Sequence, residues 1–162
     1  MHPDAEKLLA DYPNIDMVEA FITDCNGAAR GKWLPIGKLS SLLTAGIKLP
    51  KSAIAQDAWG RDVPSIALDN GDIDGWCQAI PGSLKPVLGS HGVDQAQVVL
   101  TMFKDNGSPL LSDPRQVLAG VTQALEAKGL YPRVAIELEF NLFDRQTAGQ
   151  SLRDALPKAH QT

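Results

Sequence analysis

Several kinds of residue are scarce in this sequence, and each shortage argues against a class of function. Aromatic residues make up 6% of the 162 residues, too few for a platform on which nucleic-acid bases stack. The net charge is -4, and lysine and arginine form no cluster that could follow a phosphate backbone. No apolar run approaches the roughly 20 residues that cross a bilayer, and no basic-then-apolar leader opens the chain. We therefore expect neither a nucleic-acid partner nor a membrane anchor.

Cysteine is also scarce, and the two cysteines are too far apart to act together. Cys25 and Cys77 form no Cys-x-x-Cys pair, so the sequence indicates neither a zinc knuckle nor a redox pair. We expect a cytoplasmic protein with reduced thiols.

The apolar periodicity predicts an α+β fold with short elements. Two apolar runs flank Asn26-Gly27, a step that is typical of a β-hairpin. The helix expected after Ser112 or Asp113 has proline near its first position and Gly129 as its stop. The predicted helices cover 3–12, 36–46 and 112–129, and the further strands cover 71–80, 95–103 and 134–144.

Two stretches show little periodicity. Residues 50–64 are expected to form a loop, with Trp59 as a possible anchor. The polar tail from Gln146 onward is expected to be loosely ordered.

The last predicted strand, VAIELEFNLFD, carries two glutamates in its middle. Side chains alternate along a strand, so Glu137 and Glu139 would share one face, with Cβ atoms roughly 7 Å apart. Two carboxylates that close repel unless they have a cation, a shared proton or open water. Carboxylate oxygens suit Mg²⁺ or Mn²⁺, which makes the pair a candidate for metal binding. The alternative is a solvent-facing side of an edge strand.

Five motifs in order resemble the beginning of the glutamine synthetase family. They are DCNGAARGKWLP, DNGDIDG, PGSLKP, DNGSPLLSDPRQVL and IELEFNLFD, which together cover most of the chain. The similarity is greatest to the branch of γ-glutamylpolyamine synthetases, which are glutamate–putrescine ligases.

This resemblance implies a fold and a division of the chain. It implies an N-terminal helix over residues 1–13 and a β-grasp domain over 14–108. Residues 109–162 would be the truncated start of the catalytic domain.

The resemblance also implies a reaction and its site residues. Such enzymes use ATP to form γ-glutamyl phosphate, which an amine such as putrescine then attacks. By resemblance, Glu137 would bind the metal that touches the nucleotide phosphates, and Glu139 the metal that orients glutamate. Relatives assemble as stacked homo-oligomeric rings, so the intact protein is expected to be an oligomer.

One segment departs from the family pattern. Ammonia-using members carry an Asp-Gly-Ser-Ser motif that helps to hold ammonium, whereas the matching stretch here is LPKSAIAQD. Of this motif only Ser52 is expected to keep a substrate-binding role, the alternative being a surface hydroxyl. Pro50 or Lys51 in place of the aspartate would weaken the capture of a cation, which favours an amine acceptor.

Two other functions remain open on the sequence alone. One is a glutamine synthetase that uses ammonia, and the other is a non-catalytic β-grasp binding or assembly module, or a gene remnant. Because the nucleotide site and the remaining metal ligands of the family are not found in these residues, we expect no turnover by this chain alone.

Overall fold

A computed structural model describes residues 1–63, 73–89 and 92–140 of the chain. The chain divides into two units, Met1–Leu130 and Tyr131–Thr162, which are described separately. All helices and strands in the described residues belong to the first unit.

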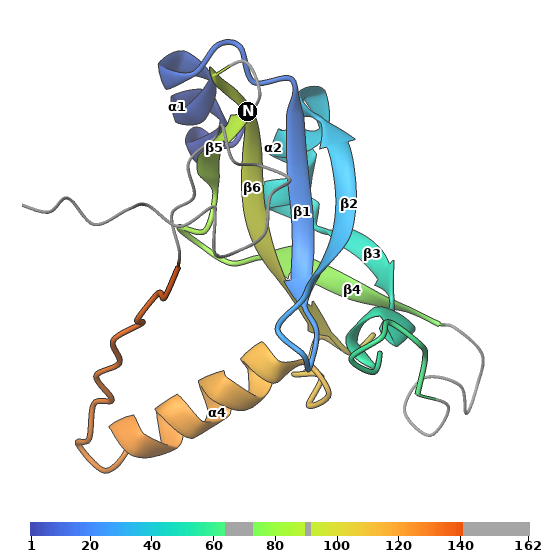
Figure 1. Cartoon of the computed structure of the whole chain (residues 1–162), viewed down its shortest axis with the longest axis vertical. Helices are drawn as coiled ribbons and strands as arrows, with labels where there is room; N and C mark the ends of the chain where they lie inside the picture. Colours follow the sequence, from blue (N-terminus) through green and yellow to red (C-terminus); the bar gives the residue numbers. More distant parts are fainter. Residues whose placement is uncertain (64–72, 90–91, 141–162) are drawn as a thin grey trace, which may run out of the picture. The chain divides into compact units, whose positions relative to one another are not determined.

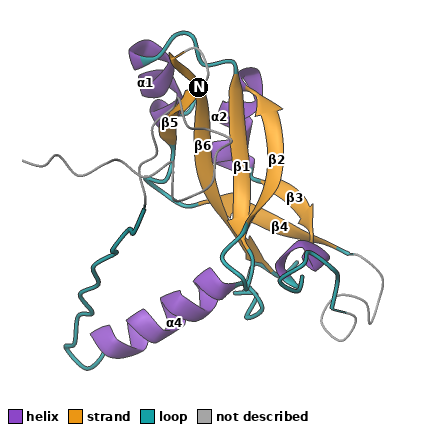
Figure 2. Ribbon diagram, viewed as in Figure 1, coloured by secondary structure: helices purple, strands orange, loops and turns teal. Residues whose placement is uncertain are grey.

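The first unit is built around a six-stranded mixed sheet (Figures 1 and 2). The strand order is β2-β1-β6-β4-β3, and β5 pairs with the early part of β6. The only parallel pairing among the described strands joins β1 to β6; every other pair is antiparallel. The strands are β1 (Met17–Thr23), β2 (Ala29–Pro35), β3 (Ile47–Pro50), β4 (Asp74–Ala79), β5 (Lys85–Gly89) and β6 (Gly92–Phe103).

The core follows from the period-two pattern of the two central strands. Alternate residues of β1, beginning at Val18, are buried, and the same holds in β6 from Ala96 to Met102. Because successive side chains of a strand point to opposite faces, both strands present one apolar face to the same core. The helix α2 (Leu39–Ala45) adds Leu39 and Leu42 to it.

The predicted hairpin and the first two helices are confirmed. β1 and β2 pair in register from Met17 opposite Pro35 to Thr23 opposite Ala29, around the Asn-Gly turn. The helix α1 (Pro3–Asp11) is capped by His2, whose Nδ1 accepts from the Asp4 amide. The second predicted helix is a 3-10 turn, η1 (Ile36–Lys38), followed by α2, which stops at Gly46 with φ 71°. A positive φ suits glycine, which has no Cβ to clash.

Two strands and a helical turn were not predicted from the sequence. β3 has only four residues, too few for a period-two pattern to stand out. β5 contains Pro86, which reads as a turn residue but is tolerated because this strand pairs on one side only. The stretch expected to be a loop begins with a 3-10 turn, η2 (Lys51–Ile54).

Asp113 fixes the start of the last helix, α4 (Pro114–Glu126). Its Oδ1 accepts from the Arg115 amide, and its Oδ2 accepts from the Met102 amide at 2.7 Å and from Thr101 Oγ1 at 2.9 Å. Asp113 is therefore the N-cap, not Ser112, and it ties α4 to β6. The apolar stripe of α4, at Val117 and Val121 among others, is exposed.

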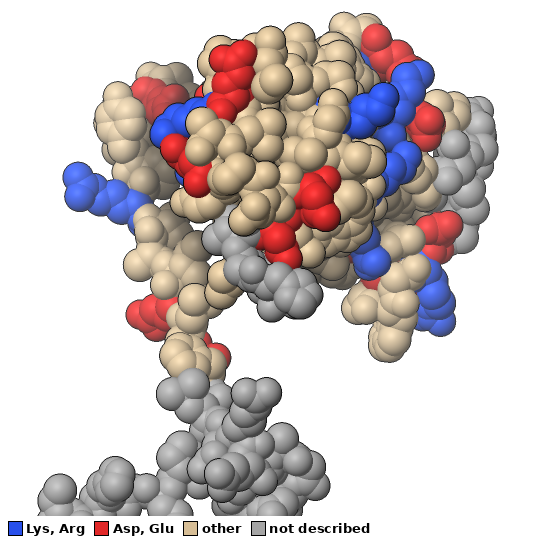
Figure 3. All heavy atoms as spheres, turned by 90° about the horizontal axis from the view of Figure 1, so that it is seen from above, with Lys and Arg blue, Asp and Glu red and all other residues tan. Residues whose placement is uncertain are grey.

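The α+β class is confirmed, and the β1–β2 hairpin, α2 and the parallel β1–β6 pair are compatible with the β-grasp prediction. The predicted domain boundaries remain predictions. None of the described helices combines the length and apolar character that crossing a bilayer requires. The face in Figure 3 carries acidic and basic side chains interspersed with each other.

Candidate functional site

The two candidate metal ligands, Glu137 and Glu139, lie in the second unit, within the described stretch 131–140. This stretch contains neither helix nor strand, and every residue in it is exposed. The strand predicted over 134–144 is therefore wrong for residues 134–140, and its last four residues lie outside the described part of the chain.

The missing strand has a simple physical reason. A strand is stabilised by backbone hydrogen bonds to a neighbour, and no residue of 131–140 pairs with another described segment. The apolar alternation that predicted the strand is present in the sequence, since Val134 and Ile136 occupy alternate positions. Both side chains are nevertheless 86% and 85% exposed. An apolar face of this kind favours a strand only when a partner covers it.

The described residues do not complete a metal site around this pair. Nowhere in the described ranges do three His, Cys, Asp or Glu side chains gather closely enough to hold a metal ion. Two carboxylates supply the right kind of oxygen donor for Mg²⁺ or Mn²⁺, but too few donors for a protein cage. The two glutamates therefore provide the type of donor that a divalent ion prefers, but not enough donors to hold it.

Ser52, the candidate substrate-binding residue, lies in η2 of the first unit and is 7% exposed. Its carbonyl accepts from the Ala55 amide, which closes the turn. The residue is thus part of the packed base of a loop, and the alternative reading as a surface hydroxyl does not fit its burial. The three predicted site residues are divided between the two units.

The loop that follows η2 is ordered by Asp57, which the sequence analysis did not single out for structure. The amide and the guanidinium Nε of Arg61 donate to this carboxylate, the latter at 2.8 Å, and the Trp59 amide also donates. The Arg61 bonds, with the Trp59 amide, hold the pKa of Asp57 below its ordinary value. Trp59 is not the expected anchor: it is 80% exposed, and the Arg61 guanidinium lies over its ring.

A second carboxylate, Asp24, organises the tip of the β1–β2 hairpin and was also missed. It is fully buried and accepts from the amides of Asn26 and Ala28 and from Arg30 Nε at 3.0 Å. Burial alone would raise the pKa of this carboxyl, but these donors together lower it below its ordinary value. The signal in the sequence is an aspartate two residues before Asn-Gly, a position typical of an Asx turn.

The hairpin tip and the η2 loop touch each other. Asn26 Nδ2 donates to the Gln56 carbonyl at 2.8 Å, although 30 positions separate the two residues. This hydrogen bond joins two surface loops of the first unit.

Sequence comparison identifies relatives over most of the chain. No protein-family model matches. The chain is 38% identical over 145 residues to gamma-glutamylputrescine synthetase of Escherichia coli, a match that covers 88% of this chain and 30% of the relative. It is 30% identical over 134 residues to gamma-glutamylethanolamide synthetase of Streptomyces coelicolor, covering 80% of this chain and 29% of that protein. The chain thus spans less than a third of either relative.

Solved structures share the fold. A complex of GmaS with ADP matches with a TM-score of 0.60 at 19% identity, over 79% of this chain and 26% of that one. A glutamine synthase homologue matches with the same TM-score at 20% identity, over 70% of this chain and 27% of its own. Together these matches support an N-terminal portion of the glutamine synthetase family, near the polyamine synthetase branch, as the motifs predicted.

Proposed function

We propose that this chain is the N-terminal part of an ATP-dependent ligase that joins the γ-carboxylate of glutamate to an amine. The acceptor would be a polyamine such as putrescine, and the intermediate γ-glutamyl phosphate. The observation that carries this proposal is the 38% identity to a gamma-glutamylputrescine synthetase over 88% of the chain. The second relative also makes, by its name, a γ-glutamyl amide of an amine and not glutamine.

Glu137 and Glu139 would each contribute one ligand to a different divalent metal site of the whole enzyme, Glu137 to the ion that touches the nucleotide phosphates and Glu139 to the ion that orients glutamate. Bound Mg²⁺ or Mn²⁺ would offset the repulsion between the ATP phosphates and the glutamate carboxylate. The remaining ligands would come from outside the described residues, since these gather no three-residue group. The pair's exposure is consistent with a role that needs partner groups.

The η2 loop would face the acceptor amine. Where ammonia-using relatives have an aspartate, this loop has Pro50 and Lys51, so no carboxylate occupies that position, and Asp57, further along the loop, is bonded to Arg61. A substrate contact by the buried Ser52 would require a shift of η2. The intact ligase would be a homo-oligomer of stacked rings.

A chimera tests the ligase proposal. The matching region of the Escherichia coli gamma-glutamylputrescine synthetase is replaced by this chain, and ADP and γ-glutamyl amide are measured with putrescine, ethanolamine or ammonia. We expect glutamate-dependent turnover that prefers an amine to ammonia. Preference for ammonia would support a glutamine synthetase. A folded, assembled chimera without turnover would favour the non-catalytic module.

Variants of the chimera test the glutamate pair. Mutating a residue that only hydrogen-bonds to a metal ligand typically lowers metal affinity or activity roughly 10–100-fold. Replacing a ligand itself, by Glu137→Gln or Glu139→Gln, should therefore raise the Mn²⁺ concentration needed for half-maximal activity by at least roughly that factor. Glu126→Gln, at the exposed end of α4, is the matched control and should leave the requirement unchanged. Unchanged metal dependence in both site variants would remove the glutamates from the metal site. The chain by itself should show no glutamate-dependent ATP hydrolysis with either metal.

A further inference from the structure

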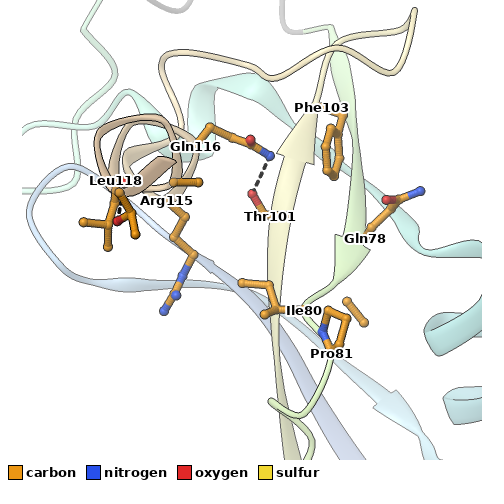
Figure 4. A pocket seen from close by; sticks show the side chains of 11 residues that line it. Gln78, Ile80, Pro81, Thr101, Phe103, Arg115, Gln116 and Leu118 are labelled. Atoms are coloured by element: carbon orange, nitrogen blue, oxygen red, sulfur yellow. Dashed lines mark hydrogen bonds between the residues drawn. The ribbon is translucent and has the colours of Figure 1, made fainter. Parts of the chain in front are cut away.

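A cavity of about 550 Å³ opens between α4 and the strands β4 and β6, within the first unit (Figure 4). Apolar side chains form most of its wall, including Ile80, Pro81, Phe103 and Leu118. Neither Ser52 nor either of the two glutamates is among its lining residues. A mostly apolar pocket with a few polar groups is typical of a small-molecule site.

Of the described residues that line this cavity, Arg115 is the only charged one. Its Nε is buried and has no hydrogen-bond partner among the residues that the structure describes. Figure 4 shows the side chain leaving α4 and extending along the side of the pocket where Ile80 lies. Because nearly all buried donors in folded proteins are paired, a buried guanidinium donor without an acceptor calls for an explanation.

The neighbouring polar groups do not supply that acceptor. Gln116 Nε2 donates to Thr101 Oγ1 at 2.9 Å, and Thr101 Oγ1 donates to Asp113 Oδ2. Both oxygens of Asp113 are already engaged, by the amides of Met102 and Arg115 and by the Thr101 hydroxyl. Among the described residues, Asp113 therefore accepts from the Arg115 backbone amide and not from its guanidinium.

We propose that this cavity binds a small monocarboxylate with a compact apolar body. Its carboxylate would accept from the planar donor fork of Arg115, which matches carboxylate geometry. Its alkyl or aryl part would lie against Ile80, Phe103 and Leu118. A phosphate dianion fits less well, because the wall has a single cation and few other free donors. This site does not depend on the ligase proposal.

The test is an amide NMR titration of the 162-residue chain with benzoate, and with benzamide as the neutral analogue of the same shape. We expect saturable shifts at Thr101, Phe103 and Gln116. A charge-assisted pair with arginine contributes enough that benzamide should bind at least about tenfold more weakly. Arg115→Gln should weaken benzoate to a similar degree, whereas Arg133→Gln, an exposed arginine of the second unit, should not.

A filling variant keeps the proposal testable if Arg115→Gln disturbs the fold. Ala119 lines the cavity from the exposed side of α4, so Ala119→Phe should occupy the space and abolish the benzoate shifts while the remaining spectrum persists. Three results would each overturn the proposal. They are no saturable shift by benzoate, equal binding of benzamide, and benzoate binding that survives both Arg115→Gln and Ala119→Phe.

Discussion

The Asp24 carboxylate shows how one buried charge can define a turn. It is the acceptor for two hairpin amides and for Arg30, and the Arg30 side chain is itself two-thirds covered, with 33% exposure. Asp24→Asn keeps the shape but removes the charge, and hydrogen bonds to charged groups contribute about 1.5–3 kcal/mol. We expect a loss of roughly 1–3 kcal/mol in the free energy of unfolding at pH 7, measured by urea denaturation.

The pH dependence of this effect has a definite sign. The pKa of Asp24 is lowered from 3.8 by folding, so its stabilisation is present above that value and is lost as the pH falls through the lower native pKa. The difference between the wild type and Asp24→Asn should therefore shrink in acid. Asp105→Asn, at an exposed turn, is the matched control and should change stability by less than about 0.5 kcal/mol. An Asp24→Asn protein as stable as the wild type at pH 7 would contradict this account.

A single side chain, Asp113, links helix α4 to strand β6. Asp113 caps the helix and also accepts from the Met102 amide inside the sheet. Asp113→Ala removes a cap and leaves a buried amide unpaired, which together should cost roughly 2–4 kcal/mol. Hydrogen exchange of the Met102 amide should accelerate in this variant.

Ser112 provides the control for that experiment, because the sequence alone did not decide whether Ser112 or Asp113 is the N-cap of α4. It is exposed, and Asp113 makes the cap bond to Arg115. Ser112→Ala should change the free energy of unfolding by less than about 0.5 kcal/mol. A larger effect of Ser112→Ala than of Asp113→Ala would mean that the cap is assigned to the wrong residue.

Local chemistry predicted those elements whose signals lie within a few residues. The Asn-Gly turn fixed the β1–β2 hairpin, and the proline and glycine near its ends marked α4. The strands β3 and β5 were not predicted, because β3 is only four residues long and β5 contains Pro86. The position of β3 depends on pairing with β4, which is distant in sequence, and that of β5 on pairing with β6, which follows it directly.

The sequence indicated the chemistry of the candidate site but not its geometry. The residue types of Glu137 and Glu139 and the family motifs around them indicated metal binding, which stays a prediction, and the comparisons support the family resemblance. Whether these residues pair as a strand depends on a neighbour that no local pattern specifies, and residues 131–140 have none among the described segments. Asp24 and Asp57 were missed although their bonding partners lie only two to six residues away, because an aspartate near a turn does not by itself specify which amides and which arginine it accepts from.

At the scale of the whole molecule, the core of the first unit should make stability sensitive to alkali. Cys77 lies in β4 and is fully buried; burial, with a smaller contribution from the charge of Asp113, raises the pKa of its thiol to about 12. The unfolded chain would release this proton near pH 9.0, so the native state holds it more tightly. The stabilisation is thus fully present below pH 9.0 and is lost as the pH rises toward 12, with a slope of up to roughly 1.4 kcal/mol per pH unit.

Cys77→Ala tests this linkage. The variant should lose about 1 kcal/mol at pH 7 through the small cavity it creates. Between pH 9 and 11 its free energy of unfolding should decline less steeply than that of the wild type, because no buried thiol remains to ionise on unfolding. Cys25→Ala removes the exposed thiol instead and should retain the steep decline, since Cys25 is not part of the core. Parallel alkaline curves for the wild type and Cys77→Ala would show that the buried thiol does not set this limit.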